Sequence, residues 1–466
     1  MLRDDEEYKR AQEAWVSNCT GGSITEILSV VTSLVASHLL WSTLSLHSSI
    51  PSQNLFIQIV IYVVPVLLSQ TVAADHAILV ALALVSMSFL FSRITPSSPQ
   101  QTPESSQFYK SYLTVYRAGI MMVTCMAILA VDFPIFPRRF AKVETFGTSL
   151  MDVGVGSVVF SSGIVASRAY LNRHPVPRMM AMIKAFRSAL PILTLGFLRF
   201  ILTKGVDYQE HTSEYGLHWN FFFTLGFLPP FVTLASFMQQ WVSFSALAMV
   251  IASAYQLALY YGLQSWILDA PRVDILSANK EGICSFIGYV AIFLLGLESG
   301  MIIFRNDLSQ SSLVRWLGVK PDAPNSKHVG VHLMVQACAL WTLLGCWWWY
   351  LCSGDENEMF NVSRRMANLP YVIWVVAFNL TLLGWLVWVE YLYPVPGRGP
   401  SLLDAVNVNG LVTFLWANIL TGLVNLSMRT LYASTIQSLA VCFIYITVVA
   451  LLPWILWRHY NIRVKL

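Results

Sequence analysis

Charged side chains are scarce in this 466-residue chain: they make up 12% of it, against 56% hydrophobic residues. A soluble protein of this length needs more polar surface, so the composition excludes a soluble globular domain. Several sequence signatures are also missing. The chain has no P-loop, dinucleotide fingerprint, Gly-x-Ser-x-Gly elbow or His-Glu-x-x-His zinc helix, and its seven cysteines lack metal-type spacing. No internal repeat of half the chain is present, which disfavours a transporter built from two related halves.

Hydrophobic windows of about 18 or more residues, long enough to cross a bilayer core, recur along the whole sequence. We therefore predict an all-α polytopic membrane protein with about thirteen transmembrane helices in one bundle. The bundle occupies residues 24–457, between a polar N-terminal segment (1–23) and a basic tail (458–466). The expected spans lie near residues 24–46, 55–72, 75–92, 111–131, 147–168, 188–204, 219–237, 241–262, 283–304, 329–352, 370–391, 407–427 and 435–457.

The distribution of Lys and Arg predicts which face of the membrane each end occupies, because cytosolic loops carry more positive charge. It places the tail 458–466 in the cytosol and the segment 1–23 in the lumen. Asn18-Cys19-Thr20 in that segment is a glycosylation sequon, so Asn18 is a candidate glycosylation site. The alternative is a chance sequon that lies too close to the first span to be modified.

The segment from Asp132 to Glu144 concentrates charge between two long apolar stretches. It holds five ionisable groups and two prolines, and the prolines exclude a further span. At the end of the fourth span the Asp132 carboxylate is partly desolvated and suited to act as a general base, with Lys142 supplying positive charge to an oxyanion. Arg138 and Arg139 are candidate phosphate contacts in the case that this segment opens to the cytosolic side. In the alternative interpretation these charges hold lipid headgroups and pair with one another.

Two sets of polar residues lie within predicted spans. Asp152 falls near the start of the fifth span, where a carboxylate is a functional candidate because its burial must be offset by a partner. In the twelfth span, which also contains Asn409, helical spacing puts Asn407, Asn418 and Asn425 near one line. We predict that these amides face inward along a single helix. They either join helices structurally or form a polar wall for a substrate headgroup.

Two further polar helix starts, Glu214–Asn220 and Asn279–Lys280, are expected on the same face as the charged segment. Glu214 and His218 are spaced i, i+4 and can pair, which gives a histidine able to move protons near neutrality. An interfacial salt bridge beside an aromatic belt is the alternative.

These segments resemble the glucosaminyl-phosphatidylinositol inositol acyltransferases of GPI-anchor biosynthesis. The resemblance covers nearly the whole chain and implies a multi-pass enzyme of the endoplasmic reticulum membrane. Such an enzyme moves a fatty acyl chain, typically palmitoyl, from long-chain acyl-CoA to the inositol 2-hydroxyl of glucosaminyl-phosphatidylinositol. We expect membrane lipid around the bundle, no bound metal or cofactor, and no nucleic-acid partner. The blocks that carry the resemblance are Asn18–Ser23, Asp132–Gly156, Tyr215–Asn220, Asn279–Gly282 and Asn409–Asn425.

The resemblance also suggests that Asp132 and Lys142 are the catalytic pair. Two other functions stay open: acyl transfer to a different glycolipid, and lipid transport or flipping past Asp152 and the amide stripe. The route of the donor is a further open point, because acyl-CoA is made in the cytosol whereas the predicted topology puts Asp132 at the lumenal end. The residues expected to contact substrate are Arg138, Arg139, Asp152, His218, Asn220, Asn279, Lys280, Asn409 and Asn418.

Overall fold

The chain folds into a helical bundle, as predicted. The computed structural model describes residues 2–46, 51–94, 109–171, 177–204, 212–305, 307–308, 311–352, 360–395 and 397–464. Within these ranges, eleven helical segments are long and apolar enough to cross a membrane. Their helices are α2 (Ile24–Ser45), α4 (Ala77–Ile94), α5 (Ser111–Ala130), α6 (Leu150–Leu171), α7 (Arg178–Lys204), α10 (Phe244–Ala258), α13 (Lys280–Phe304), α15 (Asn325–Leu351), α16 (Leu369–Leu392), α18 (Gly410–Ser427) and α19 (Thr435–Arg458).

The other two predicted spans are the 16-residue apolar helices α3 (Leu55–Gln70) and α9 (Phe221–Ser236), so a helix is found at each of the predicted positions. The segment that begins with α10 continues through a π-helical turn, η3 (Leu259–Leu263), into α11 (Gln264–Asp269). The remaining elements are short or peripheral. They are α1 (Leu2–Val16), η1 (Ala74–His76), η2 (Arg138–Phe140), α8 (Thr212–Tyr215), η3 (Leu259–Leu263), α11 (Gln264–Asp269), α12 (Ile275–Ala278), α14 (Ser312–Trp316), α17 (Ser401–Val408) and η5 (Thr430–Tyr432).

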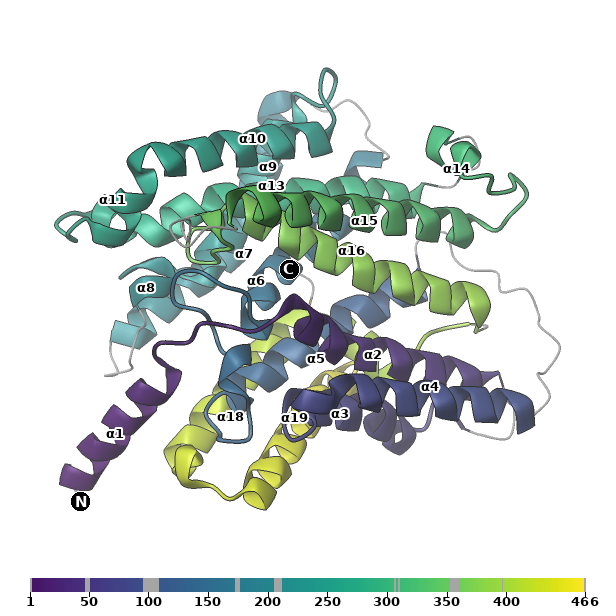
Figure 1. Cartoon of the computed structure of the whole chain (residues 1–466), viewed down its shortest axis with the longest axis horizontal. Helices are drawn as coiled ribbons and strands as arrows, with labels where there is room; N and C mark the ends of the chain where they lie inside the picture. Colours follow the sequence, from purple (N-terminus) through teal and green to yellow (C-terminus); the bar gives the residue numbers. More distant parts are fainter. Residues whose placement is uncertain are drawn as a thin grey trace.

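The centre of the bundle is formed by α16, which is buried along most of its length. Figure 1 shows α13, α15 and α16 lying side by side, with α2 next to α16 and α4 on the other side of α2. Helices α6 and α13 approach closely because glycines face the partner backbone. A Cβ added at Gly163 would lie 2.3 Å from the carbonyl oxygen of Phe293, and one added at Gly296 would lie 2.3 Å from that of Phe160. Small residues thus allow tight helix packing here.

The twelfth predicted span is interrupted. Its helices α17 and α18 are separated at Asn409, whose φ of −112° and ψ of 37° are not helical. Asn407 therefore lies on a different helix from Asn418 and Asn425. Asn418 is exposed, and its Nδ2 donates to the carbonyl oxygen of Phe414 in the same helix over 2.7 Å. The predicted inward stripe of amides along one helix is wrong.

Several polar loops meet at one end of the bundle. The N–H of Leu217 donates to the carbonyl oxygen of Ala278 over 2.9 Å, and the N–H of Gly147 to that of Val362 over 2.8 Å. The Lys142 Nζ of the charged segment also lies 2.7 Å from the Glu214 Oε1, so both polar helix starts lie at the same end as the charged segment, as predicted. In Figure 1, α8 and α11 mark this end at the left, whereas α14 lies at the right. The loops that meet here, called the loop cluster below, are 131–149, 212–220, 270–279 and 360–368.

Candidate active site

The charged segment after α5 forms a compact turn anchored by aromatic side chains. The N–H of Phe133 donates to the carbonyl oxygen of Ala130 over 2.9 Å, which closes the end of α5. Phe133, Phe136 and Phe140 are all buried in the core. The prolines and the single 3₁₀ turn η2 prevent the backbone from continuing as a helix. The polar side chains of the segment are therefore held at the edge of the bundle by its buried rings.

Asp132 lies at the start of this turn and contacts α18. The Nδ2 of Asn425 donates to its Oδ2 over 2.8 Å. Burial raises the pKa of Asp132 above its usual range, whereas the hydrogen bond from Asn425 and the charge of Lys142 act in the opposite direction. A partly buried carboxylate with a raised pKa is suited to accept a proton from a hydroxyl group.

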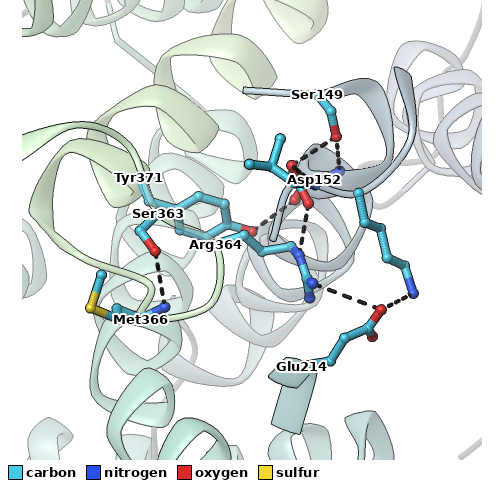
Figure 2. Close-up of polar contacts among 9 residues, drawn as sticks. Ser149, Asp152, Glu214, Ser363, Arg364, Met366 and Tyr371 are labelled. Atoms are coloured by element: carbon cyan, nitrogen blue, oxygen red, sulfur yellow. Dashed lines mark hydrogen bonds and ion pairs between the residues drawn. The ribbon is translucent and has the colours of Figure 1, made fainter. Parts of the chain in front are cut away.

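In the described part of the chain, the ion-pair partner of Lys142 is Glu214 and not Asp132. The Lys142 Nζ lies 2.7 Å from the Glu214 Oε1, and the same oxygen lies 3.8 Å from the Arg364 Nη2. The Arg364 Nε in turn lies 2.7 Å from the Asp152 Oδ1, as Figure 2 shows. The side chain of Lys142 is 42% exposed, that of Arg364 4% and that of Asp152 0%. The ion pairs thus run from a partly exposed amine into the core.

Asp152 is enclosed by protein. Its Oδ2 accepts hydrogen bonds from the Ser149 hydroxyl over 2.7 Å and from the N–H of Val143 over 3.2 Å, while Oδ1 faces Arg364. Its carbonyl oxygen accepts from the Tyr371 hydroxyl over 2.9 Å (Figure 2). Direct contact with substrate stays a prediction for Asp152, but these contacts favour a structural role, because both carboxylate oxygens have protein partners.

Arg138 and Arg139 also have partners within the protein. The Arg138 Nη2 donates to the carbonyl oxygen of Ser17 over 2.6 Å, and its guanidinium covers a tryptophan ring of α1. Arg139 forms ion pairs with Glu26 and Asp75. Both arginines therefore attach the charged segment to neighbouring elements. Phosphate binding by them stays a prediction, and these contacts instead agree with the alternative in which the charges pair internally.

Glu214 and His218, both in the described part of the chain, do not form the pair that their spacing in the sequence allows. Helix α8 ends at Tyr215, and Gly216 has a φ of +101°, so the two residues do not share a helix and the i, i+4 geometry is lost. Glu214 faces Lys142 and Arg364 instead.

The predicted contact residues of the two helix starts form hydrogen bonds within the protein, most of them with backbone groups. Asn279 Oδ1 accepts from the N–H of His218 over 2.8 Å, and Asn279 Nδ2 lies 3.2 Å from the His218 Nδ1. Asn220 caps α9 by accepting from the N–H of Phe222 over 3.0 Å. Lys280 is buried, and its ammonium donates to the carbonyl oxygen of Ala270 over 2.5 Å. Substrate contact stays a prediction for these four side chains, each of which has a structural partner.

Two of the predicted contact residues lie away from the loop cluster or face outward. Asn409 holds the C-terminal tail, because its Oδ1 accepts from the N–H of Val464 over 2.9 Å. Asn418 points away from the core, as described above. Asn18 is exposed in the N-terminal segment, and its glycosylation stays a prediction. No group of three or more His, Cys, Asp or Glu side chains is arranged to hold a metal ion within the residues that the structure describes.

Sequence reasoning missed the role of Arg364 and left Asn425 out of the site. A signal for Arg364 was present: Arg364 and Arg365 form a basic pair in the short loop that precedes the nearly uncharged helix α16. The buried Asp152 also required a cationic partner. The sequence alone does not say which arginine supplies it.

Comparison with known proteins decides the family. A family model described as GWT1 matches residues 8–456. The chain belongs to the GWT1 family. Two relatives are each called GPI-anchored wall transfer protein 1. The one from Gibberella zeae is 38% identical over the full length of both chains, and the one from Yarrowia lipolytica is 40% identical over 98% of this chain and 99% of its own.

A third relative of the same name, from Aspergillus fumigatus, is 38% identical over 99% of both chains. The resemblance found in the sequence is therefore confirmed. As a GWT1-family member, the protein is a multi-pass membrane acyltransferase that acylates inositol in GPI-anchor biosynthesis.

Proposed function

We propose that this GWT1-family enzyme transfers a long-chain acyl group, typically palmitoyl, from acyl-CoA to the inositol 2-hydroxyl of glucosaminyl-phosphatidylinositol. We place this reaction in the endoplasmic reticulum membrane, with Asp132 and Lys142 as the catalytic pair. Family membership supports the two substrates. One structural observation supports the pair: Asp132, which accepts a 2.8 Å hydrogen bond from Asn425, and Lys142 lie on the same turn, anchored by buried phenylalanines, at one end of the bundle.

In this reaction Asp132 takes the proton from the inositol 2-hydroxyl, and the hydroxyl oxygen attacks the carbonyl carbon of the thioester. The ammonium of Lys142 stabilises the negative charge that develops on the carbonyl oxygen. The carbon–sulfur bond then breaks, the CoA thiolate leaves, and Asp132 returns the proton to sulfur. The acyl group passes directly from donor to acceptor, so the scheme has no covalent acyl-enzyme.

The alternative of lipid transport or flipping relied on Asp152 and on the amide stripe. Asn407 and Asn418 lie on different helices and Asn418 faces outward, so the stripe no longer supports that alternative. Both carboxylate oxygens of Asp152 already have protein partners. Acyl transfer is therefore the function that the arrangement supports best.

The proposal is tested with purified enzyme, labelled palmitoyl-CoA and a set of acceptors. We expect label on glucosaminyl-phosphatidylinositol and none on its 2-deoxy-inositol analogue, which lacks the attacking hydroxyl. Transfer to the 2-deoxy analogue would contradict the assigned position. Transfer to another glycolipid, with glucosaminyl-phosphatidylinositol inert, would contradict the assigned acceptor.

A further inference from the structure

We propose that Glu214 is a positioning residue that holds the ammonium of Lys142 near Asp132 while keeping the two catalytic groups out of direct contact. This inference rests on the catalytic roles proposed above. Two carboxylates compete for one ammonium, and the structure shows that Glu214 makes the 2.7 Å contact. Asp132 interacts with the same ammonium only at longer range within the described residues.

The contacts around Lys142 form a closed ring. On the side-chain path, Lys142 contacts Glu214, Glu214 faces Arg364, and Arg364 contacts Asp152. On the backbone path, the N–H of Val143, the residue next to Lys142, donates to the Oδ2 of Asp152 over 3.2 Å. Both paths end on the same buried carboxylate, that of Asp152 in the first turn of α6 (Figure 2). The ring therefore fixes the backbone and the ammonium of Lys142 together.

This restraint matters because a lysine side chain is long and flexible. Its ammonium is a point charge on a four-carbon stem, and catalysis requires that charge at one place relative to the reacting atoms. The neighbouring residues in the ring keep it there before substrate arrives. A site whose groups are held by such supporting contacts loses activity when the support is removed, even if both catalytic residues remain.

Arg364 contributes a buried positive charge to the ring, and the two carboxylates beside it stabilise that charge. Burial opposes its charged form, but Glu214 and Asp152 outweigh that effect and raise the pKa of Arg364, so the guanidinium stays protonated. With Lys142 included, the ring holds two cations and two anions and is neutral as a whole. An ion pair in the interior is retained only when such compensation is present.

The groups that face Asp132 explain why the place of Lys142 matters for the base. Asn425 of α18 donates a hydrogen bond to it, and Cys442 and Tyr445 of α19 lie within electrostatic range of it. These three side chains carry no charge at neutral pH. Among the residues that the structure describes, the charged group that acts on Asp132 is Lys142. If the ammonium moved into direct contact, Asp132 would become a weaker base, and the ammonium would be less available to the oxyanion.

The test is Glu214→Gln, which removes the charge and keeps the shape. We expect kcat to fall on the order of 10- to 100-fold, with KM for both substrates unchanged, because positioning is lost and binding is kept. The variant frees Lys142 to pair with Asp132 and removes the negative charge of Glu214, and both changes lower the pKa of Asp132. The acid limb of the pH profile of kcat/KM therefore moves to lower pH. Glu214→Asp, which keeps the charge on a shorter side chain, restores part of kcat.

Glu26→Gln is the matched control. It removes the ion pair with Arg139 of the same segment, and we expect wild-type kcat and an unmoved acid limb. Each variant is first checked for wild-type elution and melting temperature in detergent. If Glu214→Gln fails this check, the pH profile of kcat/KM of Glu214→Asp is used in its place. We expect its acid limb to move to lower pH as well.

Two outcomes overturn the inference alone: wild-type kcat in the Glu214 variants, or a lower kcat with an unmoved acid limb, which indicates a merely structural role. Asp132→Asn and Lys142→Met are measured alongside. If these two are inactive, the proposed function stands whatever Glu214 shows. If both turn over at the wild-type rate, the proposed catalytic pair itself fails.

Discussion

Asn425 donates a 2.8 Å hydrogen bond to Asp132 across a separation of 293 positions in the sequence. The contact joins the last turns of α18 to the charged turn that follows α5. It stabilises the ionised form of Asp132, whereas burial opposes that form. The basicity of the proposed catalytic carboxylate is therefore set by a balance between burial, one amide and the ammonium of Lys142.

Replacing Asn425 by Ala removes the hydrogen bond to the carboxylate. The pKa of Asp132 rises further, and because a general base works only when deprotonated, the acid limb of the pH profile of kcat/KM moves to higher pH. This shift is opposite in direction to the one expected for Glu214→Gln. Ser427→Ala, an exposed change on the same helix, serves as control. An acid limb that does not move in Asn425→Ala would show that this amide does not tune the base.

The spans were predictable because each is long and almost free of charge, and this signal does not depend on packing. The interruption at Asn409 was not, because the sequence around it reads as one amphipathic helix. Tertiary contacts hold the break: Asn409 bonds to the backbone of Ile462 and Val464, more than fifty positions away. Such contacts exist only once the C-terminal tail is in place.

The charged residues of the candidate site could be predicted from the sequence, whereas most of their ion-pair partners could not. Asp132, Lys142 and Asp152 stand out because charged residues are rare in this chain. The partner of Asp152 is Arg364, 212 positions away, and helix packing decides that pairing. Glu214 pairs outside its own segment because the left-handed turn at Gly216 ends α8.

Asp152→Asn tests the structural role of the buried ion pair. The variant leaves the guanidinium of Arg364 without its 2.7 Å carboxylate partner, and we expect the free energy of unfolding to fall by about 3–5 kcal/mol. The double variant Asp152→Asn/Arg364→Met removes both charges and recovers part of that loss. Unfolding in detergent followed by tryptophan fluorescence gives the comparison. A loss in the single variant below about 1 kcal/mol would fit an exposed pair and contradict the buried one.

Arg138→Ala separates an anchoring role from phosphate binding. The variant loses the bond to the carbonyl oxygen of Ser17 and the contact with the α1 tryptophan ring. We expect faster amide hydrogen exchange in residues 6–20 and an unchanged KM for acyl-CoA. Arg10→Ala, an exposed change in α1, is the control. A raised KM with unchanged exchange would instead support the predicted phosphate contact.

The catalytic pair is tested most directly by the single-turnover rate of acyl transfer at saturating acyl-CoA and glucosaminyl-phosphatidylinositol, in folded Asp132→Asn and Lys142→Met enzymes. We predict that each variant still binds acyl-CoA and that its transfer rate falls roughly 10²–10⁴-fold, because each has lost proton transfer or charge stabilisation in the transition state. A wild-type transfer rate in either variant would contradict the role assigned to that residue.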